Sequence, residues 1–224
     1  MTYFVSDLHG EYELFYSLLE KIDFSEKDKM YVCGDILEKG DGSLKLLSLI
    51  CSMKNIYCVM GNHDRNFVKF YHTIMENSPT DFDVVLSSLR EFFFEDNELL
   101  TWEMVDYLEA LPYYIETDDF ICVHAGVTLD ENKSIVPLSD VSVEHLIFDR
   151  RFKDEDVIHN SGKCVFYGHT VAENGKITTY KRENTTGNSI KDFYKIHLDT
   201  GAWQNGILGC FCLETCECIY VKNR

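Results

Sequence analysis

Three short polar motifs follow apolar runs at nearly constant spacing, and they constrain the fold of the chain more than any other feature. They are Asp7-Leu8-His9-Gly10, Gly34-Asp35 and Gly61-Asn62-His63-Asp64. Asp7 lies 28 residues before Asp35, and Asp35 lies 27 residues before Asn62. Steps of this length match successive strand–helix units, so we expect the motifs at equivalent points on neighbouring strands.

The runs around these motifs alternate between strand-like and helix-like patterns. Apolar residues at helical spacing predict helices over Glu11–Ile22 and Ser43–Met53. The order β-α-β-α-β predicts parallel strands joined by right-handed crossovers. The expected strands cover Thr2–Ser6, Lys29–Cys33 and Ile56–Met60.

The second half of the chain contains mostly short β-like runs. A hairpin is expected over Gly206–Val221, with its turn near Glu214-Thr215, and an exposed loop or irregular hairpin over Glu173–Ser189. Further strands are expected over Tyr113–Glu116, Phe120–Val123, Lys163–Tyr167 and Lys195–Leu198.

Two more polar motifs, His124-Ala125-Gly126 and Gly168-His169-Thr170, directly follow strand-like runs of this second half. Ligands of open α/β sheets bind beyond the carboxyl ends of the strands. We therefore expect all five motifs to converge on one site, although they span most of the chain.

The segment after the third motif reads as a helical insert over roughly residues 65–112. A helix is expected after Asp64, and two more over Phe82–Phe94 and Trp102–Leu111, the last closed by Pro112. We find no internal repeat and no linker-like composition, so we expect one domain over residues 1–224. The insert follows the third motif and is expected to shape the mouth of the site.

The five motifs offer two aspartates, one asparagine and several histidines as ligands for metal ions. Mixed oxygen and imidazole ligation suits manganese, iron or zinc better than calcium or magnesium alone. A carboxylate shared between two ions fits a pair about 3.5–4 Å apart, which can clamp the attacking and the leaving oxygen of a phosphoryl transfer. The motifs therefore predict a centre for two divalent ions.

The ordered motifs also carry a resemblance to a known family. D-x-H, GD, GNHD, HAG and GHT together resemble the calcineurin-like metallophosphoesterase superfamily. Ser6–Gly10 and Leu198–Ala202 are similar to its phosphoprotein phosphatase branch, especially bacterial and phage members and their diadenosine-tetraphosphatase relatives. The resemblance implies an α/β fold in which two mixed sheets pack face to face with helices outside, in four α/β/β/α layers.

The resemblance also implies roles for the motif residues. Water activated between the two ions would be the nucleophile, and His63 would protonate the leaving oxygen, since an imidazole titrates near neutral pH. Manganese is the expected metal, with iron, zinc or magnesium as alternatives. The implied metal ligands are Asp7 and His9 for the first ion, Asp35 as the bridge, and Asn62, His124 and His169 for the second ion.

The second motif departs from the family's usual GDxxDRG, because it reads Gly34-Asp35-Ile36-Leu37-Glu38-Lys39-Gly40. Glu38 keeps the carboxylate that orients the catalytic histidine. Lys39 keeps a positive charge but loses the two-pronged contact that arginine makes with phosphate. Further phosphate contacts are expected from Arg150, in a segment loosely similar to the family's, and from Arg65. The alternative for these charged residues is an ordinary surface role.

The formal net charge of −17 repels nucleic acids and anionic membranes, so neither is expected as a partner. A phosphorylated substrate would be repelled too, so a phosphatase needs the local positive charge that metal ions supply. No run of about 18 apolar residues is present, and the start of the chain reads as a strand and not as a signal peptide. The nine cysteines read as reduced thiols, which favours a cytoplasmic location.

Four cysteines near the C-terminal hairpin offer a competing zinc site. Their spacing, C-x-C-x3-C-x-C, is not the usual C-x2-C type. With a turn at Glu214-Thr215, strand alternation sends Cys210 and Cys212 to one face and Cys216 and Cys218 to the other. We therefore expect packed thiols instead of a zinc site.

Three functions remain open at this point. The leading expectation is a serine/threonine protein phosphatase acting on phosphorylated proteins. The first alternative is a bis(5'-nucleosyl)-tetraphosphatase, whose substrate is the nucleotide diadenosine tetraphosphate, and the second is a non-catalytic scaffold with the same fold. Retention of every implied metal ligand and of His63 argues against the scaffold. The oligomeric state is left open.

Overall fold

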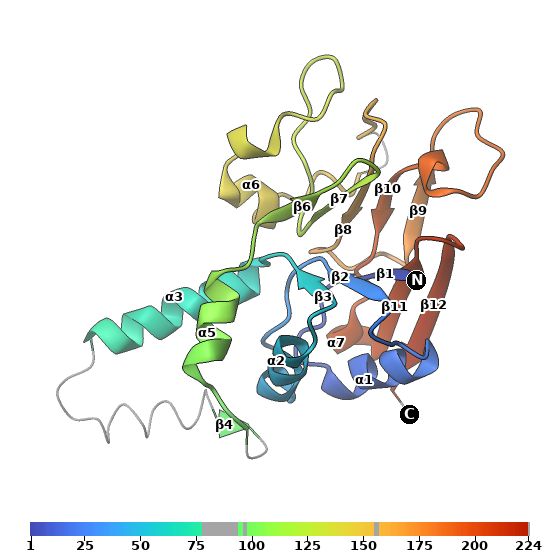
Figure 1. Cartoon of the computed structure of the whole chain (residues 1–224). Helices are drawn as coiled ribbons and strands as arrows, with labels where there is room; N and C mark the ends of the chain where they lie inside the picture. The colour runs from blue at the N-terminus through green and yellow to red at the C-terminus, as the bar shows by residue number, and fades with distance from the viewer. Residues whose placement is uncertain (78–93, 96–97, 155–156, 224) are drawn as a thin grey trace.

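Two five-stranded mixed β-sheets pack face to face in the computed structural model of the chain (Figure 1). The structure describes residues 1–77, 94–95, 98–154 and 157–223. The first sheet has the order β12-β11-β1-β2-β3, in which β1, β2 and β3 are parallel. Its strands are β1 (Thr2–Val5), β2 (Lys29–Val32), β3 (Ile56–Cys58), β11 (Ile207–Cys212) and β12 (Glu217–Lys222).

The second sheet has the order β6-β7-β8-β10-β9. Strands β7, β8 and β10 are parallel, and the edge strands β6 and β9 are antiparallel to their neighbours. The α/β fold of two mixed sheets flanked by helices, expected from the resemblance, is therefore confirmed. The strands are β6 (Tyr114–Glu116), β7 (Phe120–Val123), β8 (Cys164–Tyr167), β9 (Thr178–Lys181) and β10 (Phe193–His197).

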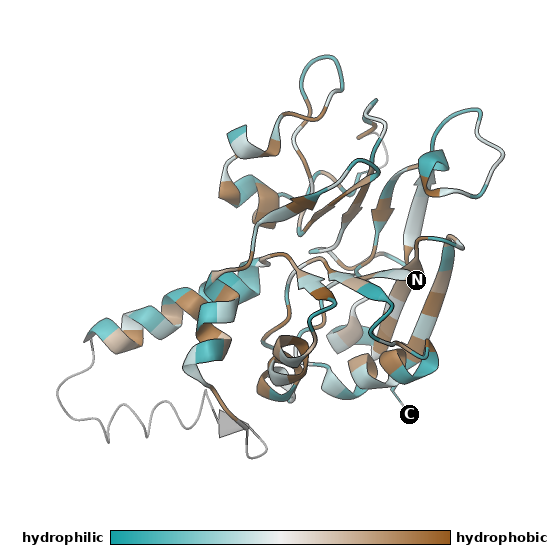
Figure 2. Ribbon diagram, viewed as in Figure 1, coloured by the Kyte–Doolittle hydropathy of each residue, from teal (hydrophilic) through white to brown (hydrophobic). Residues whose placement is uncertain are grey.

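Aromatic side chains fill the space between the two sheets. Phe4 of β1 stacks on Phe166 of β8 with ring centroids 3.7 Å apart, and Phe120 and Phe211 pack around this pair. All four rings are buried, so the apolar surface that they remove from water stabilises the contact between the sheets. Figure 2 shows hydrophobic (brown) residues along several strands of both sheets and mainly hydrophilic (teal) residues in the outer loops.

Helices cover the outer faces of both sheets. The apolar stripes of α1 and α2 pack against the outer side chains of the first sheet, such as Val5 and Met30. Leu146 and Ile147 of α6 pack against the second sheet in the same way. Outside the insert, the α-helices and the short 3-10 helices (η) are α1 (Tyr12–Lys21), α2 (Ser43–Ser52), η1 (Leu138–Asp140), α6 (Val143–Phe148), η2 (Ile190–Asp192) and α7 (Ala202–Asn205).

The expected insert is helical only in part. α3 (Asn62–Asn77) begins within the third motif, and α5 (Trp102–Glu109) lies beside it, as Figure 1 shows. Between them β4 (Phe94–Glu95) and β5 (Glu98–Leu99) form a short antiparallel pair. The helix expected over Phe82–Phe94 lies outside the described residues, except for Phe94, which belongs to β4. No helix in the described part of the chain is long and apolar enough to cross a membrane.

The C-terminal hairpin has the expected register, with Phe211 opposite Cys218 and Cys212 opposite Glu217. Cys210 and Cys212 therefore join the core under α1, and Cys216 and Cys218 lie against the core between the sheets. The two pairs point to opposite faces, so they do not share a tetrahedral site. In the part of the chain that the structure describes, all nine cysteines are free.

Candidate metal centre

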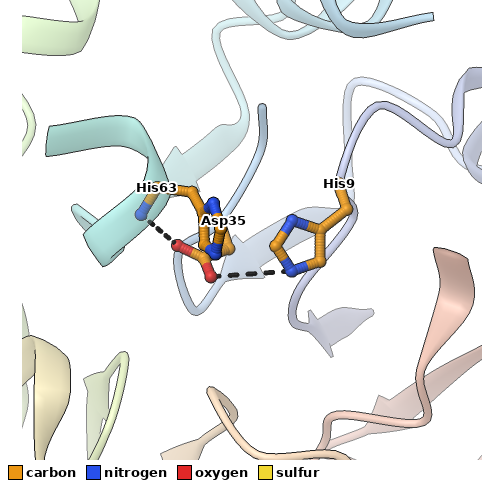
Figure 3. Close-up of side chains that lie close together, drawn as sticks. All are labelled: His9, Asp35 and His63. Carbon is orange, nitrogen blue, oxygen red and sulfur yellow. Dashed lines mark hydrogen bonds and ion pairs between the residues drawn. The ribbon is translucent and has the colours of Figure 1, made fainter. Parts of the chain in front are cut away.

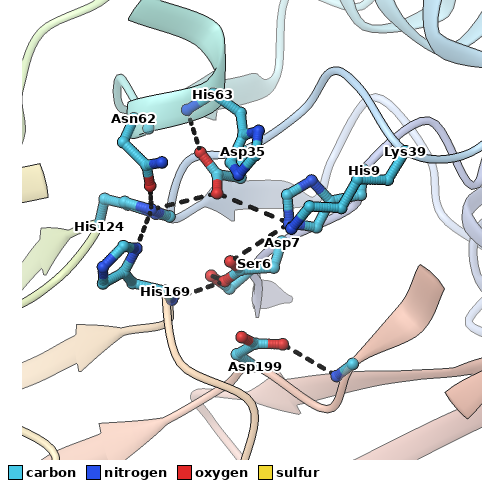
Figure 4. Close-up of polar contacts among 12 residues, drawn as sticks. Ser6, Asp7, His9, Asp35, Lys39, Asn62, His63, His124, His169 and Asp199 are labelled. Atoms are coloured by element: carbon cyan, nitrogen blue, oxygen red, sulfur yellow. Dashed lines mark hydrogen bonds and ion pairs between the residues drawn. The ribbon is translucent and has the colours of Figure 1, made fainter. Parts of the chain in front are cut away.

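The five polar motifs follow β1, β2, β3, β7 and β8 and meet at the carboxyl ends of these strands. The backbone N–H of His169 donates to Asp7 Oδ2 at 3.0 Å, although 162 residues separate the two. The backbone N–H of Asp7 donates to the carbonyl of Gly34 at 3.1 Å, which joins the first two motifs. Motifs far apart in the sequence thus form one site, as Figure 4 shows.

Asp35 lies at the middle of this site, between two groups of histidines. Its Oδ2 atom is 3.6 Å from Nε2 of His9 and 3.3 Å from Nε2 of His124. Its Oδ1 atom accepts a hydrogen bond of 2.9 Å from the backbone N–H of His63 (Figure 3). Asp35 therefore belongs to two sets of converging ligand atoms, as a bridging carboxylate must.

The first set contains His9, Asp35 and His63, and Asp7 lies at its edge with Oδ1 3.8 Å from His9 Nε2. Nδ1 of His9 lies 3.2 Å from the carbonyl of Leu37, to which it can only donate. The lone pair of the His9 ring is therefore on Nε2, which faces both carboxylates. This is the arrangement that a metal-ligating histidine needs.

The second set contains His124, His169 and Asp35, with Asn62 beside them. Nδ1 of His124 donates to the carbonyl of Cys33 at 2.9 Å, which leaves the lone pair on Nε2. That Nε2 atom is 2.9 Å from Asn62 Oδ1 and 3.1 Å from His169 Nδ1. These ligand atoms converge in a buried place, and a metal ion bound between them would use their lone pairs.

The electrostatics of the site also favour a bound cation. Burial alone would lower the pKa of His124, but the charges of Asp35 and Asp7 and the hydrogen bonds to Asp35 and to the Cys33 carbonyl together raise this pKa to about 10. Without a metal ion, a proton therefore occupies the Nε2 lone pair that an ion would use. Burial raises the pKa of Asp7 to about 6. Burial and the charge of His124 lower the pKa of His169 to about 3. Carboxylate, amide and imidazole donors held in this way fit manganese, iron or zinc.

The predicted general acid His63 lies at the edge of the first set. Its Nδ1 atom donates to Oε2 of Glu38, and its ring meets the His9 ring edge to face with centroids 4.9 Å apart. The longer carboxylate of Glu38 therefore reaches the imidazole from its own loop. His63 is partly exposed, and Glu38 occupies Nδ1, so Nε2 is the ring nitrogen that would serve a substrate.

The three predicted phosphate-binding cations have different surroundings. Lys39 donates from Nζ to Nε2 of His9 at 2.9 Å, so it lies inside the first set. Arg150 donates to Oγ1 of Thr170 at 3.2 Å, next to the His169 loop. Arg65 forms a 2.9 Å ion pair with Glu144 and so points to α6. The structure brings Lys39 and Arg150 to the site, and it pairs Arg65 with a neighbouring helix.

Unusual backbone geometry places several of the candidate metal ligands. Asp7, Asp35 and His169 have φ values of +51°, +55° and +72°, in the left-handed region that non-glycine residues seldom adopt. A Cβ atom at Gly168 would overlap the side chains of Ser6 and Asp7. The motif glycine thus admits the close approach of two loops, and strained backbone of this kind is concentrated at functional sites.

Two residues without a predicted role also organise the site. The buried carboxylate of Asp64 accepts three backbone hydrogen bonds, from Ile36 at 2.9 Å, Leu37 at 3.1 Å and Gly61 at 3.1 Å. It therefore joins the second motif to the third. Ser6 donates from Oγ to Asp7 Oδ2. The signal for Asp64 was present, since it is the last residue of the GNHD motif, but its partners are backbone atoms that a motif does not reveal.

The chain is similar in sequence to proteins of a known family. The model of the calcineurin-like phosphoesterase family matches residues 2–197. A symmetrical bis(5'-nucleosyl)-tetraphosphatase of Aggregatibacter actinomycetemcomitans is 31% identical over 150 residues, which cover 65% of this chain and 51% of the relative. An enzyme of the same name from Buchnera aphidicola is 30% identical over 165 residues, 71% of this chain and 57% of the relative. The chain thus spans about half the length of these curated relatives.

A solved structure proposed to be a diadenosine tetraphosphatase superposes with a TM-score of 0.71 at 18% identity, covering 100% of this chain and 93% of the other. At this identity the likeness concerns the fold alone. The sequence relatives, however, contradict the leading expectation of a serine/threonine protein phosphatase, because those above are named as tetraphosphatases. The error has a physical reason: the motifs encode the metal centre, and the substrate is selected by residues around it.

Proposed function

Because this chain belongs to the calcineurin-like phosphoesterase family, we propose that it is a metal-dependent hydrolase that cleaves dinucleoside tetraphosphates, such as diadenosine tetraphosphate, symmetrically. The observation that carries the proposal is the name shared by relatives about 30% identical to this chain. The convergence of five motifs around Asp35 supports it, because their side chains form two groups that could hold the metal ions of this chemistry.

The two ions would be held by side chains of the five motifs. When bound, they would polarise the phosphoryl group and activate water for attack. Manganese is the metal that we propose, on the basis of the mixed oxygen and nitrogen donors. We propose Asp7, His9 and Asp35 for one ion, and Asp35, Asn62, His124 and His169 for the other.

His63 would act as the general acid of the reaction. Attack of water on one of the two central phosphorus atoms forms a new P–O bond and breaks the bond from that atom to the oxygen it shares with the other central phosphorus. Each half then leaves as a nucleoside diphosphate: the attacking water loses a proton to solvent, and the leaving oxygen takes a proton from Nε2 of His63. The contact between Nδ1 and Glu38 would orient the imidazole and stabilise its protonated form. Lys39 and Arg150 would bind the phosphate chain, which a protein of net charge −17 otherwise repels.

The test compares initial rates on diadenosine tetraphosphate, a phosphoserine peptide and p-nitrophenyl phosphate, with Mn²⁺ and with a chelator. We expect the nucleotide to be the best substrate and its hydrolysis to stop on chelation. His63→Asn should lower the rate by about 10²–10⁴-fold. His72→Asn is the matched control, because His72 also contacts a glutamate, Glu109, but lies on the exposed face of α3.

Each other outcome has a definite meaning. A clear preference for the phosphopeptide would overturn the proposed substrate class. Absence of hydrolysis with manganese, iron, zinc and magnesium would favour the non-catalytic scaffold. The cytoplasmic location and the single domain over residues 1–224 remain predictions that these assays do not address.

A further inference from the structure

A groove of about 460 Å³ lies beside the candidate metal centre. Its walls are the first turn of α1, the loop after Glu38, and Trp203 of α7. Lys39 is common to the groove and to the metal centre, because it lines the groove and its Nζ is 2.9 Å from Nε2 of His9. The volume is in the range of small-molecule sites, which is about 300–1,000 Å³.

The indole of Trp203 supplies this groove with an aromatic surface. Its side chain is on a four-residue helix directly after the Asp199-Thr200-Gly201 turn, and the residue is 49% exposed. Nζ of Lys39 lies 5.6 Å from the centre of the Trp203 ring. An exposed indole beside a cation at the edge of a polar site offers a flat surface on which a ring can stack.

The charges in the groove are mixed. Lys39 and Lys45 oppose the carboxylates of Glu11, Glu13 and Asp41, and Lys45 already forms a 3.4 Å ion pair with Glu13. A groove of this kind does not favour a small free anion. It suits a ligand with a flat heteroaromatic ring, with hydroxyl or amino groups that donate to carboxylates, and with a negative end next to Lys39.

We infer that this groove binds one nucleoside of the dinucleoside polyphosphate, with its base stacked on Trp203 and its phosphate chain passing Lys39 to the metal centre. The inference rests on the proposed function and adds a residue that selects the substrate. The geometry allows it, because Nζ of Lys39 lies near both the indole and the His9 ligand atom. The phosphate chain would run along Lys39 from the Trp203 ring to the His9 ligand atom.

Replacement of Trp203 separates nucleotide recognition from chemistry. Trp203→Ala should raise KM for diadenosine tetraphosphate about tenfold, which corresponds to about 1.4 kcal/mol and is typical of the loss of a base stacked on an aromatic side chain. Hydrolysis of p-nitrophenyl phosphate, which has no nucleoside, should be unchanged. Trp203→Phe should retain most of the affinity. Trp102→Ala, on α5, is the matched control, because Trp102 is 64% exposed and is the other tryptophan of the chain.

A binding measurement tests the groove without catalysis. In Trp102→Phe the indole of Trp203 is the sole tryptophan, so titration with AMP in the absence of metal should quench its fluorescence. Unquenched fluorescence together with an unchanged KM in Trp203→Ala would overturn the inference while the proposed function stands. Conversely, if wild-type protein hydrolyses p-nitrophenyl phosphate but not the dinucleotide, the proposed function fails, and the quenching still decides whether a nucleotide binds here.

Discussion

Nδ1 of His63 contacts the carboxylate of Glu38, although the two residues follow different strands of the first sheet. The backbone N–H of His63 also donates to Asp35 Oδ1 at 2.9 Å. Two carboxylates of one loop therefore hold the residue that we propose as the general acid. Glu38 contacts its imidazole, and Asp35 accepts a hydrogen bond from its backbone.

Glu38→Gln should lower kcat for diadenosine tetraphosphate about tenfold or more, because the amide keeps the shape of the side chain but not the charge that stabilises a protonated imidazole. KM should change little. The measurement is steady-state kinetics with Mn²⁺. Glu109→Gln is the control, since Glu109 makes the same kind of contact with His72 away from the site. An unchanged kcat in Glu38→Gln would remove Glu38 from the proposed mechanism.

Lys39→Met should tighten the binding of divalent ions roughly tenfold, because Nζ of Lys39 uses the same lone pair of His9 that a metal ion requires, and its charge repels the ion. KM for the dinucleotide should rise at the same time. Isothermal titration with Mn²⁺ measures the first effect. Lys45→Met removes the same charge from a residue that lies over the Tyr12 ring, and it should leave metal affinity nearly unaffected. Weaker metal binding in Lys39→Met would contradict the prediction.

Asp64→Asn should lower the free energy of unfolding by about 2–3 kcal/mol, because an amide NH₂ would face one of the three backbone N–H groups that the buried carboxylate now accepts. Urea denaturation measures this loss. Asp106→Asn, on the exposed side of α5, should cost little. Equal midpoints and slopes for the two variants would show that Asp64 does not join the motifs in the way the hydrogen bonds indicate.

The protein should become less stable as the pH falls from about 6.5 to 4, in part because of His159. Nε2 of this buried ring donates to the carbonyl of Tyr194 at 2.7 Å, and Nδ1 accepts from Ser161 Oγ at 3.1 Å. Burial lowers its pKa to about 4, below the unfolded value of 6.5. The neutral ring thus stabilises the fold above pH 6.5, and this contribution is lost as the pH falls toward the folded pKa.

His159→Gln keeps a donor for Tyr194 but cannot titrate. We expect its loss of unfolding free energy between pH 7 and pH 5 to be about 2 kcal/mol smaller than that of the wild type. Urea unfolding at both pH values gives this difference directly. If both proteins lose the same amount, protonation of His159 does not contribute to acid unfolding.

Much of the fold could be predicted because its signals are local. Short apolar runs ended at polar motifs and alternated with helix-like runs, so the parallel arrangement of β1, β2 and β3 and the position of their loops followed from pattern and spacing. The opposite faces of Cys210 and Cys218 followed from strand alternation around the turn. In each case a residue's place depends on its near neighbours in the sequence.

Features that depend on distant backbone could not be predicted. The left-handed backbone of Asp7 and Glu38, the contact of Lys39 with His9, and the three backbone partners of Asp64 all require the loops to be assembled. The short β4–β5 pair replaced an expected helix at Phe94. The substrate was misjudged for a related reason, because the motifs define the metal centre and leave open what lies beside it.

Product analysis of diadenosine tetraphosphate hydrolysis tests the proposed activity most directly. The protein is incubated with this nucleotide and Mn²⁺, and the products are separated by anion-exchange chromatography. Symmetrical cleavage predicts ADP as the sole product, two molecules from each substrate. Equal amounts of ATP and AMP, or intact nucleotide beside a phosphopeptide that is readily hydrolysed, would contradict it.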